Sequence, residues 1–125
     1  MTSNRNLYEI RSDDAWRQFR TGYATMYAAG QCENQDEYRK MMDRAFVNLE
    51  RAHAIEPENP HIVYWMAWWK DFSKVPADEI IPTLELTLDL CKSPVYRHTD
   101  HIVDIVTYAL NEYRKRQTLE VSKHD

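Results

Sequence analysis

The stretch HIVYWMAWWKDF, residues His61 to Phe72, places three tryptophans, a tyrosine, a phenylalanine and a methionine within twelve positions. Its unbroken apolar run, from Ile62 to Trp69, is far shorter than the roughly 20 residues that a membrane-spanning helix requires. Asn59 and Pro60 precede it as a helix N-cap and a proline in the first helical position, so we expect a helix from here to about Ser73. A helix that is apolar on nearly every side is normally the central element of its domain, and we expect the rest of the chain to pack around this one.

The chain on either side of this stretch also has helical patterns. Only two glycines occur, and alternating apolar and polar runs are nearly absent, which argues against sheets with tight hairpins. Ser12 is a good N-cap for a first helix that Gly30 is well placed to end. Asn34 begins a second helix, which Pro57 stops. We therefore expect an all-α fold of about five antiparallel helices joined by short turns.

The boundaries of the last two helices depend on prolines. A fourth helix is expected between Pro76 and Lys92, but Pro82 would cost about 3 kcal/mol in an undisturbed helix interior. We therefore expect either a short turn over residues 76–80 or a kink. Ser93 and Pro94 repeat the cap-plus-proline pattern, and a last helix is expected from there to about residue 117.

Length, charge and cysteine usage limit the classes of function. The 125 residues fit one domain, and we expect a flexible N-terminal arm over 1–11, a helical domain over 12–117 and a flexible C-terminal tail over 118–125. The net charge of −4 comes from 20 acidic and 16 basic residues that are scattered along the chain, so a nucleic-acid partner is not expected. Cys32 and Cys91 form no CxxC pair and no leader is evident, which favours a reducing, cytoplasmic compartment.

The segment AFVNLERAHAIEPENPHIVYWMA, residues 45–67, resembles the junction between two tetratricopeptide repeats (TPR). The matching positions are Ala45, Leu49, Ala52 and the closing Pro57, followed by Val63, Tyr64, Met66 and Ala67. The resemblance implies TPR-like right-handed helical hairpins with a C-terminal capping helix. Trp16 and Val63 would be equivalent positions 47 residues apart, whereas the repeat is usually about 34 residues long, so the first hairpin must be longer than standard.

The same resemblance implies a partner-binding groove. The positions that match its lining are His61, Tyr64, Trp68, Asp71 and Phe72. Tyrosine and tryptophan are frequent interface anchors, although Tyr64 and Trp68 could equally be core residues. The family's lysine and asparagine that bind an acidic carboxylate are replaced here by Tyr64 and Trp68, so an apolar or basic segment, such as an amphipathic helix, fits better. Trp65 and Trp69 are expected in the core.

Catalytic and metal-binding patterns are weak by comparison. His98, His101 and Asp104 fall loosely on one helical side and are possible metal ligands. No glycine pattern for phosphate binding is present, and neither cysteine has a local activating pattern. We therefore expect no cofactor and no enzymatic activity. The first hypothesis is a protein–protein interaction module, namely an adaptor, small chaperone or inhibitor. The second is a helical bundle that binds a ligand or metal and could be an enzyme. The third is that the aromatic surface closes a homodimer.

Overall fold

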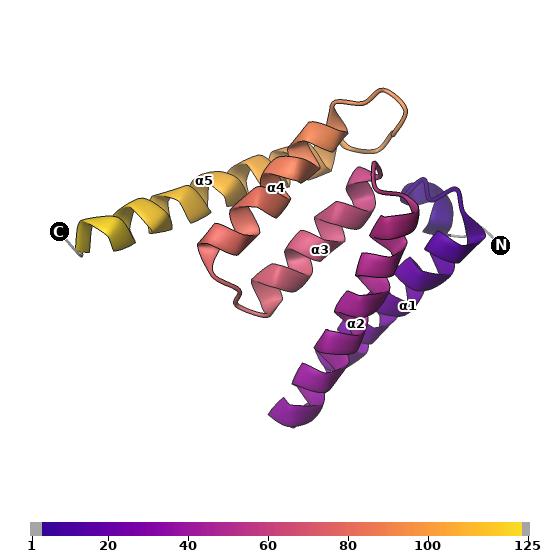
Figure 1. The fold of residues 1–125 in the computed structure, drawn as a ribbon, viewed down its shortest axis with the longest axis horizontal. Coiled ribbons are helices and arrows are strands. Elements are labelled where there is room, and N and C mark those ends of the chain that lie inside the picture. The colour runs from indigo at the N-terminus through magenta and orange to yellow at the C-terminus, as the bar shows by residue number, and fades with distance from the viewer. Residues whose placement is uncertain (1–3, 124–125) are drawn as a thin grey trace.

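The computed structural model describes residues 4–123, and within this range the fold consists of five α-helices and one short 3-10 helix, with no strand (Figure 1). The elements in chain order are η1 (Asn4–Leu7), α1 (Asp13–Ala29), α2 (Gln35–Ile55), α3 (Pro60–Phe72), α4 (Ala77–Cys91) and α5 (Asp100–Lys123). The expected all-α class with five helices is confirmed.

The predicted N-caps of the first three helices are confirmed by their hydrogen bonds. The Ser12 hydroxyl accepts from the Ala15 N–H at 3.2 Å and begins α1. The Asn34 and Asn59 side chains accept from backbone N–H groups in the first turns of α2 and α3. Each cap satisfies backbone donors that have no partner inside the helix.

The turn predicted at the start of the fourth helix does not occur. Residues Ala77 to Cys91 form a single helix that contains Pro82, so the expected turn over 76–80 was wrong. The hydrogen bond that proline cannot make would have gone to the carbonyl of Asp78, four residues earlier. Asp78 and Pro82 are both exposed in the first turns, where water can replace the missing donor.

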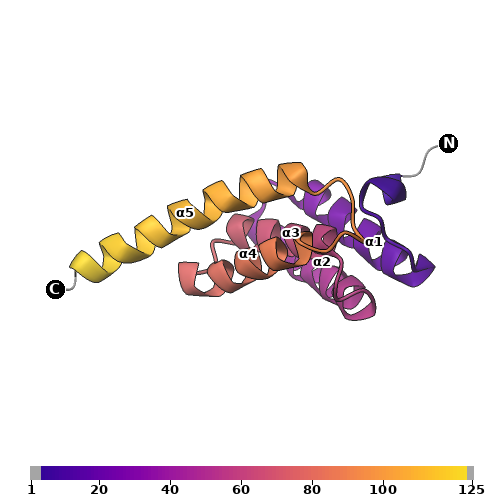
Figure 2. The same ribbon diagram turned by 90° about the horizontal axis from the view of Figure 1, so that it is seen from above.

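The last helix is displaced toward the C-terminus relative to its prediction. The Val95 N–H donates to the Ser93 hydroxyl at 3.3 Å, so the cap-plus-proline pattern forms a turn here instead of a helix start. His98 has a positive φ of 58°, and α5 begins only at Asp100. It continues to Lys123 and extends past the ends of the other helices (Figure 2). Residues 118–123, predicted to be a flexible tail, are therefore helical, and residues 124–125 lie outside the described range.

The described part of the predicted N-terminal arm packs against the helices. Ile10 is buried in the core, and the Asn59 amide donates to the Tyr8 carbonyl at 3.1 Å. The Glu56 carboxylate accepts from the backbone N–H groups of Arg11 and Ser12 at 2.9 and 2.8 Å. Residues 4–11 are therefore part of the folded domain, whereas residues 1–3 lie outside the described range.

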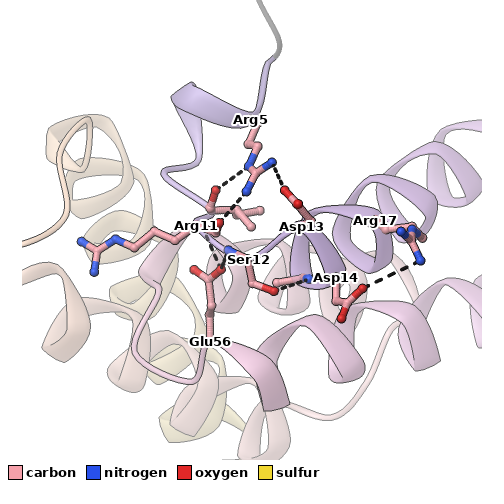
Figure 3. A network of polar contacts seen from close by, with 9 residues as sticks. Arg5, Arg11, Ser12, Asp13, Asp14, Arg17 and Glu56 are labelled. Carbon is pink, nitrogen blue, oxygen red and sulfur yellow. Dashed lines mark hydrogen bonds and ion pairs between the residues drawn. The ribbon is translucent and has the colours of Figure 1, made fainter.

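Arg5 adds side-chain bonds to the same network. Its guanidinium donates to the carbonyls of Ile10 and Arg11 and forms an ion pair with Asp13 at 2.6 Å. Figure 3 shows these groups gathered where the arm enters α1. Sequence reasoning missed this network because it joins residues of the arm to the loop between α2 and α3, far away in the chain.

The core consists of two clusters that meet at α3. The first contains buried residues of the arm, α1, α2 and the start of α3, including Ile62, and the second contains Ala67 with residues of α4 and α5. Consecutive helices pack on one another, and α3 also contacts both α1 and α5. In Figure 1, α3 lies between the α1–α2 pair and the α4–α5 pair. The expectation that the aromatic helix is the central element is confirmed.

Candidate binding surface on α3

Two rows of side chains on α3 line two different pockets. Tyr64, Trp68 and Asp71 face a pocket that α4 and α5 complete, which we call the α5 pocket. Trp65 and Phe72 face a second pocket completed by α1 and α2, the α1 pocket. Residues three or four apart share a side of a helix, so each pocket receives one row.

The α5 pocket has a volume of about 290 Å³. Its floor is apolar because Ala67, Ile80, Leu84 and Val106 belong to the second core cluster. The remaining lining residues are Tyr64, Trp68, Asp71, Ile105, Tyr108, Ala109, Glu112, Tyr113 and Arg116. Such an apolar cavity with a few polar groups at its edge is typical of a binding site.

The aromatic rings of the α3 row contact one another directly. The Tyr64 and Trp68 ring centroids lie 6.0 Å apart at an interplanar angle of 78°, and Trp68 stacks on Phe72 at 5.5 Å and 26°. Tyr64 also meets the His101 ring edge-on at 6.4 Å. Tyr64 and Trp68 are half-buried and Phe72 is 50% exposed, so these rings combine fixed orientation with accessible surface.

Polar groups gather at the α5 side of this pocket. The Tyr113 hydroxyl donates to the Asp71 carboxylate. Burial and this hydrogen bond together raise the pKa of Tyr113 to about 12. The Arg116 guanidinium lies over the Tyr113 ring at 5.1 Å, and Glu112 forms a surface ion pair with Lys115 at 3.4 Å.

The α1 pocket is larger, at about 420 Å³, and differs in chemistry. Its lining consists of Tyr23, Met26, Tyr27, Gly30, Gln31, Tyr38, Met42, Trp65 and Phe72. Among the described residues, none that lines it is charged. Trp65 meets Tyr23 edge-on at 4.8 Å and 88°, and the Tyr38 hydroxyl donates to the Phe72 carbonyl at 3.4 Å.

His61 does not belong to this surface, so its predicted groove position was wrong. It is 2% exposed and its Nε2 atom lies 2.9 Å from the Arg97 carbonyl oxygen. The Tyr8 ring packs edge-on against it. As the second residue of α3, it lies under the arm and the loop before α5. Burial lowers the pKa of His61, against a smaller opposing effect of the Arg97 carbonyl.

The other four predicted groove residues lie along one helix but divide between the pockets. Tyr64, Trp68 and Asp71 meet in the α5 pocket, whereas Phe72 lines the α1 pocket. Trp68, which lines the α5 pocket, stacks on Phe72, which lines the α1 pocket, and we call this stacked pair the ridge.

The two tryptophans expected in the core are half-buried. Trp69 stacks on Phe46 with a centroid distance of 4.2 Å, and its indole N–H donates to the Met42 carbonyl at 2.6 Å. Trp69 therefore joins α3 to α2. Trp65 packs against the first core cluster and also lines the α1 pocket, so it contributes to both core and surface.

Sequence reasoning missed the contribution of α5 to the candidate binding surface. Ile105 is 41% exposed and lines the α5 pocket. Tyr108 is 70% exposed and lines the same pocket. Tyr108 follows Ile105 and precedes Glu112 at helical spacing, so the three side chains share one side of the helix, outside the buried stripe. This pattern could have identified them from the sequence.

The residues of the alternative metal hypothesis are not arranged as a site. His98 lies in the loop before α5, so the helical spacing assumed for His98, His101 and Asp104 is not realised. Within residues 4–123, no three or more histidine, cysteine, aspartate or glutamate side chains are grouped so that they could hold a metal ion.

No family model, curated protein or solved structure matches this chain. A proposal for its function therefore depends on the geometry described above.

Over the described range, no helix combines the length and the apolar character needed to cross a membrane.

Proposed function

We propose that this chain is a non-catalytic protein–protein interaction module, an adaptor, small chaperone or inhibitor, and that the α3 surface receives a segment of the partner. The observation that carries the proposal is the accessible aromatic ridge of Trp68 and Phe72 between two apolar pockets. A cytoplasmic location belongs to the same proposal, in keeping with the free thiols of Cys32 and Cys91.

The exposed aromatic area around the ridge supports this role. Tyr27 in the α1 pocket and Tyr108 in the α5 pocket are each 70% exposed, and Phe72 is 50% exposed. Aromatic side chains offer a large contact area with few rotatable bonds, and they are enriched among the residues that dominate binding energy. An exposed concentration of this kind usually marks an interaction site.

The TPR-like architecture is part of the proposal. In such a repeat the first helix of each hairpin lines the groove, which would assign this role to α1, α3 and the capping helix α5. Two features support the assignment: α3 contacts both α1 and α5, and all three helices contribute to the two pockets. A groove without the lysine and asparagine pair suits an apolar or basic partner segment, such as an amphipathic helix.

The test is a comparison of Trp68→Ala with Val47→Ala, since Val47 is 44% exposed on α2 and lines neither pocket. Proteins captured from a host extract by the wild-type chain are purified, and their affinities for both variants are measured by calorimetry. We expect Trp68→Ala to weaken binding by about 2 kcal/mol or more and to melt close to the wild type. Val47→Ala should bind like the wild type.

Equal affinities of the wild type and Trp68→Ala would refute the role of this surface in partner binding. Mass measurement by light scattering tests the homodimer hypothesis. A wild-type mass of twice 15.0 kDa, together with the mass of a single chain for Trp68→Ala, would show that the surface closes a dimer instead.

A further inference from the structure

The two pockets beside α3 differ in charge, and this difference bears on the kind of partner. Asp71 and Glu112 line the α5 pocket, together with one cation, Arg116. The α1 pocket is lined by tyrosines, methionines, a tryptophan and a phenylalanine with two small or polar residues. One pocket can therefore attract a charged group, and the other can receive only an uncharged one without a desolvation penalty.

The α5 pocket has the groups that bind an organic cation. Tyr64, Trp68, Tyr108 and Tyr113 provide aromatic rings, whose faces attract cations at distances of up to about 6 Å. The Asp71 carboxylate has one oxygen bonded to the Tyr113 hydroxyl, and its other oxygen can accept from a further donor. A guanidinium group can stack on a ring and bind a carboxylate at the same time.

The chain itself provides an example of this recognition. The Arg116 guanidinium lies 5.1 Å from the centroid of the Tyr113 ring, at the edge of the pocket. The ion pair of Glu112 with Lys115 is between exposed or half-exposed groups, so it holds Glu112 only weakly. Both carboxylates remain able to face an incoming cation.

We propose that the α5 pocket binds an arginine or lysine side chain of the partner while the α1 pocket binds an uncharged apolar side chain. This inference rests on the proposed function, because it specifies the segment that the α3 surface receives. The segment is basic and amphipathic, and it crosses the ridge of Trp68 and Phe72. Arg116 competes with the partner's cation, since its guanidinium already lies over the Tyr113 ring.

The test uses two small probes in place of the unknown partner: butylguanidinium, which has the head group of arginine, and butylurea, its neutral analogue. Each is titrated into isotopically labelled protein while the indole N–H resonance of Trp68 is followed by nuclear magnetic resonance. The Trp68→Phe variant identifies this resonance. We expect butylguanidinium to bind about threefold or more tightly than butylurea, the advantage that a cation–π contact provides.

Variants then assign the preference to named groups. Asp71→Asn and Glu112→Gln should each reduce the advantage of butylguanidinium without changing the affinity for butylurea. Asp104→Asn removes a carboxylate from the same helix as Glu112, but outside the pocket, and should change neither affinity. Arg116→Gln should tighten butylguanidinium binding because it removes the internal competitor.

Equal affinity for the two probes, or no binding of either, would overturn the cation preference. That outcome would leave the proposed function standing if Trp68→Ala still weakened partner binding. Loss of the preference in Asp104→Asn as well would also overturn the assignment, because it would show a general effect of charge. A melting curve for each variant establishes that it is folded, and Glu112→Gln provides the decisive measurement if Asp71→Asn unfolds.

Discussion

Asn59 provides the sharpest test of how the N-terminal arm, residues 4–11, is bound to the helices, because its side chain both caps α3 and donates a hydrogen bond to the arm. Its Oδ1 atom accepts from the His61 N–H at 2.9 Å and caps α3, while its Nδ2 atom donates to the Tyr8 carbonyl at 3.1 Å. The residue is fully buried. Asn59→Ala should lose about 1 kcal/mol for the cap and up to about 1–3 kcal/mol for the part-buried Tyr8 carbonyl that loses its donor.

Asn34 is the matched control, since it caps α2 with the same chemistry but is exposed and is bonded only to its own helix. Asn34→Ala should therefore cost only about 1 kcal/mol. Urea unfolding of both variants measures the difference: with a slope of about 1–3 kcal/mol/M, an excess loss of about 2 kcal/mol lowers the midpoint of Asn59→Ala by roughly 1 M more. Equal midpoints would show that the bond to the arm contributes nothing.

A Cβ atom added by Gly22→Ala would lie 3.0 Å from a carbonyl oxygen of α2. Although alanine is the better helix former, the free energy of unfolding of this variant, measured with urea, should therefore be about 1–2 kcal/mol lower than that of the wild type. Trp69→Phe removes the indole donor to the Met42 carbonyl and should lose about 1 kcal/mol; an unchanged midpoint would contradict this. Burial lowers the pKa of His61 in the folded protein. As the pH falls, the unfolded chain therefore protonates this histidine before the folded protein does, and stability should decrease below a pH of about 6.5. His61→Gln should flatten this pH dependence, measured by urea unfolding, whereas the exposed His98→Asn should keep it.

Local signals in the sequence predicted the first three helices well. Ser12, Asn34 and Asn59 each cap a helix where expected, because capping depends on residues within one turn. The same rule failed at Ser93, where the turn is part of a loop whose Arg97 carbonyl lies at hydrogen-bond distance from the distant His61 ring. Local patterns do not contain such contacts.

The candidate binding surface was predictable in part for the same reason. Tyr64, Trp68 and Asp71 share one side of a single helix, and the sequence alone places them together. The contributions of Tyr108 and Tyr23 depend on how α5 and α1 pack beside α3, which helical periodicity does not determine. The burial of His61 likewise depends on the arm and a distant loop.

The packing of each helix mainly on its neighbour in the chain has a consequence for the kinetics of folding. Contacts between consecutive helices require only short loops to close, and helical proteins of this kind fold in microseconds to milliseconds. The arm is different: the Arg11 guanidinium reaches the Val95 carbonyl across 84 residues of chain, and this contact forms only when both halves are in place. We therefore expect the arm to dock after the rate-limiting step, so that Asn59→Ala speeds unfolding and leaves the folding rate nearly unchanged.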